Sequence, residues 1–308
     1  MTCGKEATVY YQKYRLIVPF LLPALLLYFV FVLYPYGRAF YISMTSWKGT
    51  SASMPWVGLD NYRRLLDETR FMDALTRNGQ LLLVLPLVTI AISLLFAALF
   101  TQGGKGQGVR GSAFYRIVFF FPQVISAVIV GILFTYVYNP QYGLLNGFLG
   151  AVGLDSLERA WLGNPATILW SIAAVAVWAS VGFYMVIFIA SMQSIPTSFY
   201  EAAVLDGATR WRQFKDITLP LMWETIRTAL IYLAIAALDF FTLVQVMTGG
   251  GGGVAARKAE VAAVYMYGEA FDKSRWGSAS AVGVILLILT LLLSVVVMRV
   301  TKRETYEY

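Results

Sequence analysis

The run ATILWSIAAVAVWASVGFYMVIFIA, Ala166 to Ala190, decides the fold, because it has no charged residue over 25 positions. An α-helix rises about 1.5 Å per residue, so a run of this length can cross a hydrocarbon core of roughly 30 Å. We therefore interpret the chain as a membrane protein and look for similar runs on either side of this one.

The composition of the whole chain has the same bias. Of 308 residues, 58% are apolar and 13% are charged, whereas soluble proteins average about 45–50% and about 25%. The one cysteine, Cys3, can form no disulfide within the chain, and the lack of histidine excludes imidazole metal ligands and general bases. We expect neither a metal site nor a catalytic site. The net charge of +7 comes from basic residues beside the apolar runs, so we expect no nucleic acid to bind.

Six apolar runs predict an all-α polytopic membrane protein with six transmembrane helices. The predicted spans are residues 16–34, 81–100, 117–138, 166–190, 228–247 and 281–298. We expect an N-terminal segment (1–15), a transmembrane domain (16–298) and a tail (299–308). Residues 34–38 offer no small-residue cleavage site, so the first run should stay as an anchor.

Loop charges predict the side on which the termini lie. Loop 101–116 carries Lys105, Arg110 and Arg116 without an acid, and the tail begins with a basic residue, whereas loop 139–165 has one arginine against two acids. Cytoplasmic loops are enriched in Lys and Arg, so we expect both termini to be cytoplasmic.

The first outer loop contains a helical pattern of apolar residues. These residues are Tyr62, Leu65, Leu66, Met72 and Leu75. Their spacing predicts a short amphipathic helix, which would either pack on its own bundle or contact a partner.

The segment between the fourth and fifth spans reads QSIPTSFYEAAVLDGATRWRQFKDITLP, from Gln193 to Pro220. Pro196 should end or kink the fourth helix. Ser198 and Glu201 have the S-x-x-E spacing of a capping box, which predicts a first short helix.

A second short helix is predicted to follow. Gly207 suits the left-handed position that closes a helix, and Thr209 can cap a helix that runs to about Asp216. Pro220 marks the start of the next element. Two short helices with a bend at Gly207 are therefore expected on the cytoplasmic side.

These helices could serve either a partner protein or the chain itself. Ala202 and Ala203 leave a shallow surface that another protein's cleft can approach, while Leu205 and Phe214 can fill hydrophobic pockets. A structural lid over the bundle would use much the same residues.

At these positions the sequence resembles a known family. The string E-A-A-x-x-D-G-A is similar to the EAA loop of permease subunits in bacterial binding-protein-dependent ABC importers. The matching positions are Glu201, Ala202, Ala203, Leu205, Asp206, Gly207, Phe214, Ile217, Leu219 and Pro220. The resemblance implies the type I importer permease fold, and it implies that residues 196–220 couple the chain to an ATPase.

Other motifs are similar to the carbohydrate-uptake branch, on the side of the maltose and glycerol-phosphate type first permease. They are W-V-G-L-D-N-Y (56–62), G-L-L-N (143–146), W-L-G-N-P (161–165) and M-T-G-G-G (247–251). The run Gly249–Gly253 departs from the pattern, because such permeases usually have a proline after two or three glycines. The string A-L-D-F-F-T-L-V-Q-V-M (237–247) and the final E-Y are also similar to actinobacterial N-acetylglucosamine or chitobiose permeases.

The resemblance also implies partners. These are a second, non-identical permease, two ATPases that bind ATP and Mg, and an extracytoplasmic solute-binding protein. The resemblance also places the chain in the bacterial cytoplasmic membrane, in contact with membrane lipid. The chain itself has no G-x-x-x-x-G-K-[ST] motif and no G-x-S-x-G motif, so we expect no cofactor of its own and no enzyme activity.

Polar and aromatic residues within the spans are candidates for a substrate pathway. Asp239 is the one ionisable residue deep in a predicted span, and Gln245 follows it; Gln123, Trp178 and Tyr184 are weaker candidates. The alternative for Asp239 is a hydrogen bond between helices that fixes packing.

We therefore expect a permease subunit that translocates a sugar or oligosaccharide. The alternatives are an importer of glycerol phosphate or a polyol, and a self-contained secondary carrier. A carrier would normally have internal repeats or several buried ionisable groups, and neither is visible in the sequence.

Overall fold

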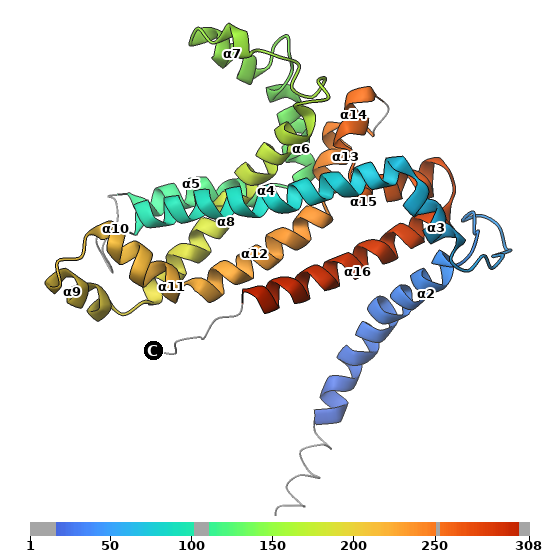
Figure 1. Ribbon diagram of the computed structural model, residues 1–308, viewed down its shortest axis with the longest axis horizontal. Coiled ribbons are helices and arrows are strands. Elements are labelled where there is room, and N and C mark those ends of the chain that lie inside the picture. The colour runs from blue at the N-terminus through green and yellow to red at the C-terminus, as the bar shows by residue number, and fades with distance from the viewer. Residues whose placement is uncertain (1–16, 102–110, 251–252, 302–308) are drawn as a thin grey trace, which may run out of the picture. The chain divides into compact units, whose positions relative to one another are not determined.

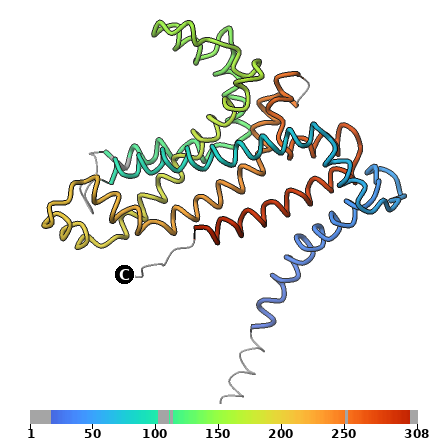
Figure 2. Tube along the Cα trace, in the orientation of Figure 1, coloured from blue at the N-terminus to red at the C-terminus, as the bar shows by residue number. Residues whose placement is uncertain are grey.

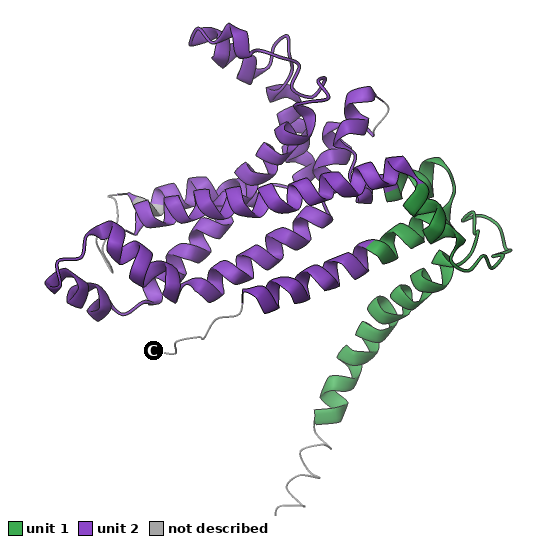
Figure 3. Ribbon diagram, in the orientation of Figure 1, with its two compact units in different colours: residues 1–67, 266–285 green, residues 68–265, 286–308 purple. Residues whose placement is uncertain are grey.

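The computed structural model describes residues 17–101, 111–250 and 253–301, and every regular element among them is a helix. The predicted N-terminal segment 1–15, Lys105, Arg110, Gly251, Gly252 and most of the tail lie outside the described residues. The chain divides into two compact units, Met1–Asp67 with Met266–Ile285 and Glu68–Tyr265 with Leu286–Tyr308 (Figure 3).

Four of the described helices are each long and apolar enough to cross a membrane. They are Ile17–Ser43, which contains α2 (Tyr34–Ser43), and α4 (Thr69–Phe100), α8 (Ile168–Ser194) and α16 (Trp276–Val300). Two more spans result if each pair of bent helices is counted as one. These pairs are α5 (Ser112–Val124) with α6 (Ala127–Val137), and Arg210–Leu221 with α12 (Trp223–Leu238).

Several helices extend beyond the apolar runs from which they were predicted. The first continues past residue 34 to Ser43, and α4 begins at Thr69, not at residue 81. Hydropathy detects only the part of a helix that suits hydrocarbon. With 32 residues α4 is about 48 Å long, whereas the hydrocarbon core is roughly 30 Å thick. Its polar first third therefore extends past the apolar part.

The predicted amphipathic helix of the outer loop is split in two. Tyr62, Leu65 and Leu66 belong to α3 (Asp60–Asp67), whereas Met72 and Leu75 belong to α4. Glu68 separates the two helices with an extended backbone, φ −82° and ψ 103°.

The prediction of continuous third and fifth spans is wrong. The third breaks at Ile125 and Ser126 with a bend of 100°, just after Pro122, whose ring and missing N–H disrupt helical hydrogen bonding. The fifth begins at Trp223, ends at Leu238 and resumes as the short α13 (Thr242–Met247).

The first unit, Met1–Asp67 with Met266–Ile285, joins the end of the N-terminal helix to the start of α16. The Asn61 amide donates to the carbonyls of Ser43 and Thr45, at 2.8 Å each. The Ser43 and Tyr62 hydroxyls are 2.6 Å apart, and the Gly277 N–H donates to the Trp47 carbonyl at 3.1 Å. The W-V-G-L-D-N-Y motif thus has a structural role, since it supplies both Asn61 and Tyr62.

The second unit, Glu68–Tyr265 with Leu286–Tyr308, is a bundle in which α4, α8 and α12 run side by side (Figure 1). The helix α5 crosses α8 where Gly182 lies against the Phe119 carbonyl, a contact that leaves no room for a side chain. The helices α6 and α7 (Leu144–Ala151) leave the bundle (Figure 2), and α6 packs on α13 where Gly131 meets Val246.

A buried asparagine on α4 organises the break in the fifth span. The Asn78 side chain is fully buried, and its amide donates to the carbonyls of Ala237 and Leu238 at 2.9 and 3.1 Å. Its oxygen accepts the Ala262 N–H at 2.8 Å, at the start of α15 (Ala262–Tyr267). Asn78 therefore satisfies backbone groups that the helix break leaves open. This role of Asn78 is not predictable from the sequence, because one asparagine among apolar residues carries no distinctive pattern.

Candidate functional site

We call residues 196–220 the EAA segment. Its first helix, α9 (Thr197–Leu205), follows directly from α8, which ends at Ser194 as Pro196 predicts. Ser198 lies inside α9 and not at its cap, and no side chain caps this end, so the predicted capping box is wrong. Pro196 takes the cap position with φ −58° and ψ 135°.

Gly207 closes α9 in the predicted left-handed conformation, with φ +73°. The Gly207 N–H donates to the Val204 carbonyl at 3.0 Å, and the Ala208 N–H donates to the Ala203 carbonyl at 2.8 Å. This pair of bonds is the Schellman motif, in which a glycine avoids the steric cost that a Cβ atom would bring.

The second helix begins at the predicted cap and continues further than predicted. The Thr209 hydroxyl accepts the Arg212 N–H at 3.4 Å, and α10 (Arg210–Gln213) follows. The helix does not end near Asp216, because a π-helical turn, η3 (Phe214–Thr218), leads directly into α11 (Leu219–Leu221). A bend of 67° then separates the helical stretch Arg210–Leu221 from α12.

Prolines explain two of the π-helical turns. Pro220 lies two residues after η3, and Pro35 lies two residues after η1 (Phe29–Leu33) in the N-terminal helix. A proline ring clashes with the carbonyl four residues earlier, and a wider turn moves that carbonyl away. Pro220 lies at the start of α11, as predicted, and it also shapes the helical turn that precedes it.

One side of the EAA segment packs on its own bundle. Tyr200, Phe214 and Ile217 contact the buried cluster formed by residues such as Met185 and Phe188. The Tyr200 and Thr218 hydroxyls are 3.0 Å apart and join the two helices of the segment. Phe214 thus packs partly on the bundle, which is the contact that a structural lid would make.

The opposite side is exposed. Leu205 at the end of α9 is 89% exposed, which is the largest exposed fraction of any large apolar side chain among the described residues. Glu201, Ala202, Asp206 and Gly207 are exposed around it. Ala203 and Leu219 are half-buried, and Pro220 is exposed. The face therefore combines one projecting apolar side chain with small neighbours.

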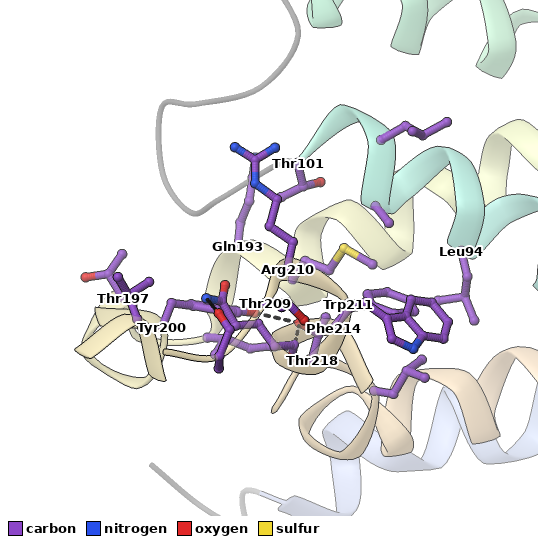
Figure 4. Close-up of a pocket in the computed structure, with 18 of the residues that line it drawn as sticks. Leu94, Thr101, Gln193, Thr197, Tyr200, Thr209, Arg210, Trp211, Phe214 and Thr218 are labelled. Carbon is purple, nitrogen blue, oxygen red and sulfur yellow. Dashed lines mark hydrogen bonds between the residues drawn. The ribbon is translucent and has the colours of Figure 1, made fainter. Parts of the chain in front are cut away.

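A groove of about 1320 Å³ lies between the EAA segment and the ends of α4 and α8. Leu94 of α4, Thr101 just after it and Gln193 of α8 line the groove together with Trp211 and Phe214 (Figure 4). Leu205 and Glu201 also line the groove. The segment is therefore attached at its inner side and open around α9.

The five candidate pathway residues are not gathered at one point. Asp239 is exposed at the end of α12, and Gln245 lies on α13 with its side-chain oxygen buried and without a hydrogen bond. Gln123 is exposed in the last turn of α5. Among the described residues, the five share no hydrogen bond, ion pair or ring contact.

The two aromatic candidates lie in different surroundings. Trp178 is 47% exposed, and its ring lies 5.0 Å from that of Phe134 on α6. Tyr184 is 9% exposed and belongs to the buried cluster beneath the EAA segment. In this structure Tyr184 therefore has the surroundings of a core residue.

The family of the chain follows from sequence comparison. Residues 68–305 match the profile of the binding-protein-dependent transport system inner membrane component. The chain belongs to this family. It is therefore a multi-pass permease subunit of an ABC importer in the cytoplasmic membrane, and the EAA motif is typical of such subunits.

Two relatives and one solved structure are similar along nearly the whole chain. The diacetylchitobiose uptake system permease protein NgcF of Streptomyces coelicolor is 40% identical over 297 residues, which are 95% of this chain and 84% of that one. The trehalose/maltose transport system permease protein MalF of Thermococcus litoralis is 30% identical over 292 residues, 95% of each chain. A bacterial ABC transporter that imports the acidic polysaccharide alginate contains a chain of the same fold, with a TM-score of 0.80, 24% identity and coverage of 98% of this chain and 100% of that one.

Proposed function

We propose that this chain is one of two non-identical permease subunits of an importer for a sugar or oligosaccharide. Two separate ATPases would bind ATP and Mg and supply the energy, and an extracytoplasmic solute-binding protein would deliver the substrate. The proposal for the substrate class rests on the two relatives, whose names give diacetylchitobiose, trehalose and maltose as their sugars.

The EAA segment would couple the chain to one ATPase. The observation that carries this proposal is the contrast between its two sides: Leu205 is 89% exposed, whereas Phe214 and Ile217 pack on the bundle core. A partner that holds Leu205 would grip a helix joined to the bundle without a flexible linker. Closure of the ATPases would then move the bundle as a rigid body. This side and both termini would be cytoplasmic.

Asp239 and Gln245 would contribute to the substrate pathway. Both lie at the break in the fifth span, and the buried oxygen of Gln245 has no partner among the described residues. An unpaired buried acceptor is costly, and a sugar hydroxyl could satisfy it. Gln123, Trp178 and Tyr184 are weaker members of the same proposal.

Reconstitution of defined subunits into proteoliposomes tests the proposed function. We expect accumulation of labelled diacetylchitobiose, maltose or trehalose only when both permeases, the ATPases, the binding protein and ATP are present. This chain alone should neither transport sugar nor hydrolyse ATP. Sugar uptake by this chain without another polypeptide would instead identify a self-contained carrier.

A further inference from the structure

A second cavity lies at the other end of the bundle from the EAA segment. It measures about 270 Å³, and the polar first third of α4 and the first turn of α8 form its walls together with α14 (Val254–Ala259). Its polar lining residues are Asp73, Thr76, Arg77, Gln80 and Lys258, and its one aromatic residue is Trp170. Ligand pockets usually measure about 300–1,000 Å³, so this cavity has room for one small ring.

The cavity lies at the edge of the apolar part of the bundle, because Leu169 and Trp170 stand near the start of the apolar run 166–190. Its α4 residues all precede Leu81, where the apolar run of α4 begins. Because α4 is longer than a hydrocarbon core is thick, this end extends into water. A water-borne ligand can therefore reach the cavity, on the side opposite the EAA segment.

Part of the lining is held rigidly. Arg77 is 11% exposed at its side chain, pairs with Asp73 at 3.2 Å and donates to the Glu260 carbonyl at 3.0 Å. Glu260 in turn accepts two hydrogen bonds from Arg70, at 2.6 and 2.7 Å. These bonds fix the end of α14 beside α4, so the cavity exists before any ligand binds.

The remaining lining groups have unused hydrogen-bonding capacity. No hydrogen bond or ion pair within the described chain involves the Trp170 indole N–H, the Gln80 amide or the Lys258 ammonium. Trp170 is 42% exposed, which leaves part of its ring accessible. The Asp73 carboxylate, 53% exposed, can still accept at its second oxygen.

We propose that this cavity is a carbohydrate-binding subsite on the outer face, with one sugar ring stacked on Trp170. Sugar hydroxyls would donate to Asp73 and to the Gln80 oxygen, and would accept from Lys258 and the Trp170 indole. A sugar ring suits this set because it presents donors, acceptors and an apolar C–H face together. The inference deepens the proposed function, on which it rests for the class of ligand.

Ligand-detected NMR tests the subsite apart from transport. The importer is assembled in phosphatidylcholine nanodiscs without the binding protein, and saturation transfer to N-acetylglucosamine and methyl β-glucoside is measured. We expect binding in the wild type, roughly tenfold weaker binding in Trp170→Ala, which removes the aromatic face, and a change within about threefold in Trp170→Phe, which keeps one. Trp56→Ala, an exposed tryptophan in the other unit, is the matched control and should bind like the wild type.

Equal binding in the wild type and Trp170→Ala would overturn the subsite, as would no transfer in the wild type. If Trp170→Ala does not assemble, binding is measured in Trp170→Phe and Gln80→Ala instead. Unchanged binding in Gln80→Ala would then overturn the subsite. Transport in proteoliposomes is a separate measurement. A wild type that imports sugar but gives no saturation transfer would refute this inference and leave the proposed function standing.

Discussion

At the scale of single residues, Gly207 is the position where backbone geometry is most demanding. Its φ is +73°, and apart from its two chain neighbours no residue has a heavy atom within 4 Å of where a Cβ atom would stand. A substitution therefore acts through backbone strain and not through a clash. The left-handed conformation costs an ordinary residue about 1–2 kcal/mol and a β-branched residue more.

Gly207→Val should therefore uncouple ATP hydrolysis from transport without preventing membrane insertion. A cost of at least about 1–2 kcal/mol shifts the population of correctly closed α9 by at least about 5- to 30-fold. The measurement is sugar uptake per ATP hydrolysed in proteoliposomes. Gly207→Asn is the control, because asparagine tolerates this conformation and should keep most of the uptake. Normal coupled uptake by the valine variant would count heavily against a role for this bend.

Glu269, in the π-helical turn η4 (Gly268–Asp272), predicts a pH dependence of the unit formed by Met1–Asp67 and Met266–Ile285. Burial would raise its pKa, but the hydrogen bond from Lys273 at 2.6 Å and the charges of Lys273 and Arg275 outweigh burial and hold the pKa below its usual value. The charged form is thus favoured by folding. Its contribution to stability is complete above the unfolded pKa, near 4.3, and is lost as the pH falls through the lower folded pKa.

Thermal unfolding of the purified protein at pH 7 and below pH 4 checks this dependence. The wild type should lose stability on acidification, whereas Glu269→Gln should be less stable at pH 7 and lose less between the two values. Breaking a buried ion pair costs about 3–5 kcal/mol of stability. Because Lys273 and Arg275 are partly exposed, the loss in Glu269→Gln should be about 3 kcal/mol or less. An equal loss in both proteins would contradict the assignment.

At the scale of helices, the π-helical turn η3 determines which side of the EAA segment faces the bundle. It holds Phe214 and Ile217 against the buried cluster, and Pro220 accounts for its wide turn. Pro220→Ala would allow an ordinary α-helix. Removing the extra residue of the π turn rotates the preceding residues by about 100° relative to α11.

Pro220→Ala should consequently assemble and lose most coupled transport, on the order of tenfold. ATP hydrolysis and uptake are measured on the same preparation. Pro35→Ala is the matched control, since Pro35 follows η1 at the same spacing but lies in the N-terminal helix, far along the chain from the EAA segment. Equal effects of the two substitutions on coupling would show that η3 has no special role.

Local chemistry explains which features the sequence could predict. The closing role of Gly207, the cap at Thr209 and the helix end at Pro196 each depend on a few adjacent residues, and all three were predicted. The side to which Phe214 turns could not be predicted, because a core and an interface both use aromatic residues. The break after Leu238 has no glycine or proline to mark it, and it depends on Asn78, 160 positions away in sequence.

At the scale of the whole molecule, a sugar pathway must connect the two faces of the membrane. The two broken spans are the places where backbone polar groups become available within the bundle. Membrane proteins tolerate such breaks only where protein or water-filled cavities satisfy these groups. Asp239 and Gln245 flank one break, and α13 packs on α6, which follows the other.

Asp239→Asn and Gln245→Ala should therefore reduce turnover per assembled complex, by roughly tenfold each, while leaving the amount of complex unchanged. The physical reason is that hydrogen bonds to charged groups contribute about 1.5–3 kcal/mol, whereas neutral ones contribute about 0.5–1.5 kcal/mol. Turnover is measured as sugar uptake normalised to assembled complex, quantified from the ATPase that co-purifies. Asp206 is exposed on the EAA segment, and Asp206→Asn is the control that separates a pathway effect from a coupling effect. This substitution should alter the ratio of sugar uptake to ATP hydrolysis and leave the apparent sugar affinity unchanged. If turnover per complex is unchanged in both pathway variants, Asp239 and Gln245 serve packing only, and the pathway lies elsewhere in the bundle.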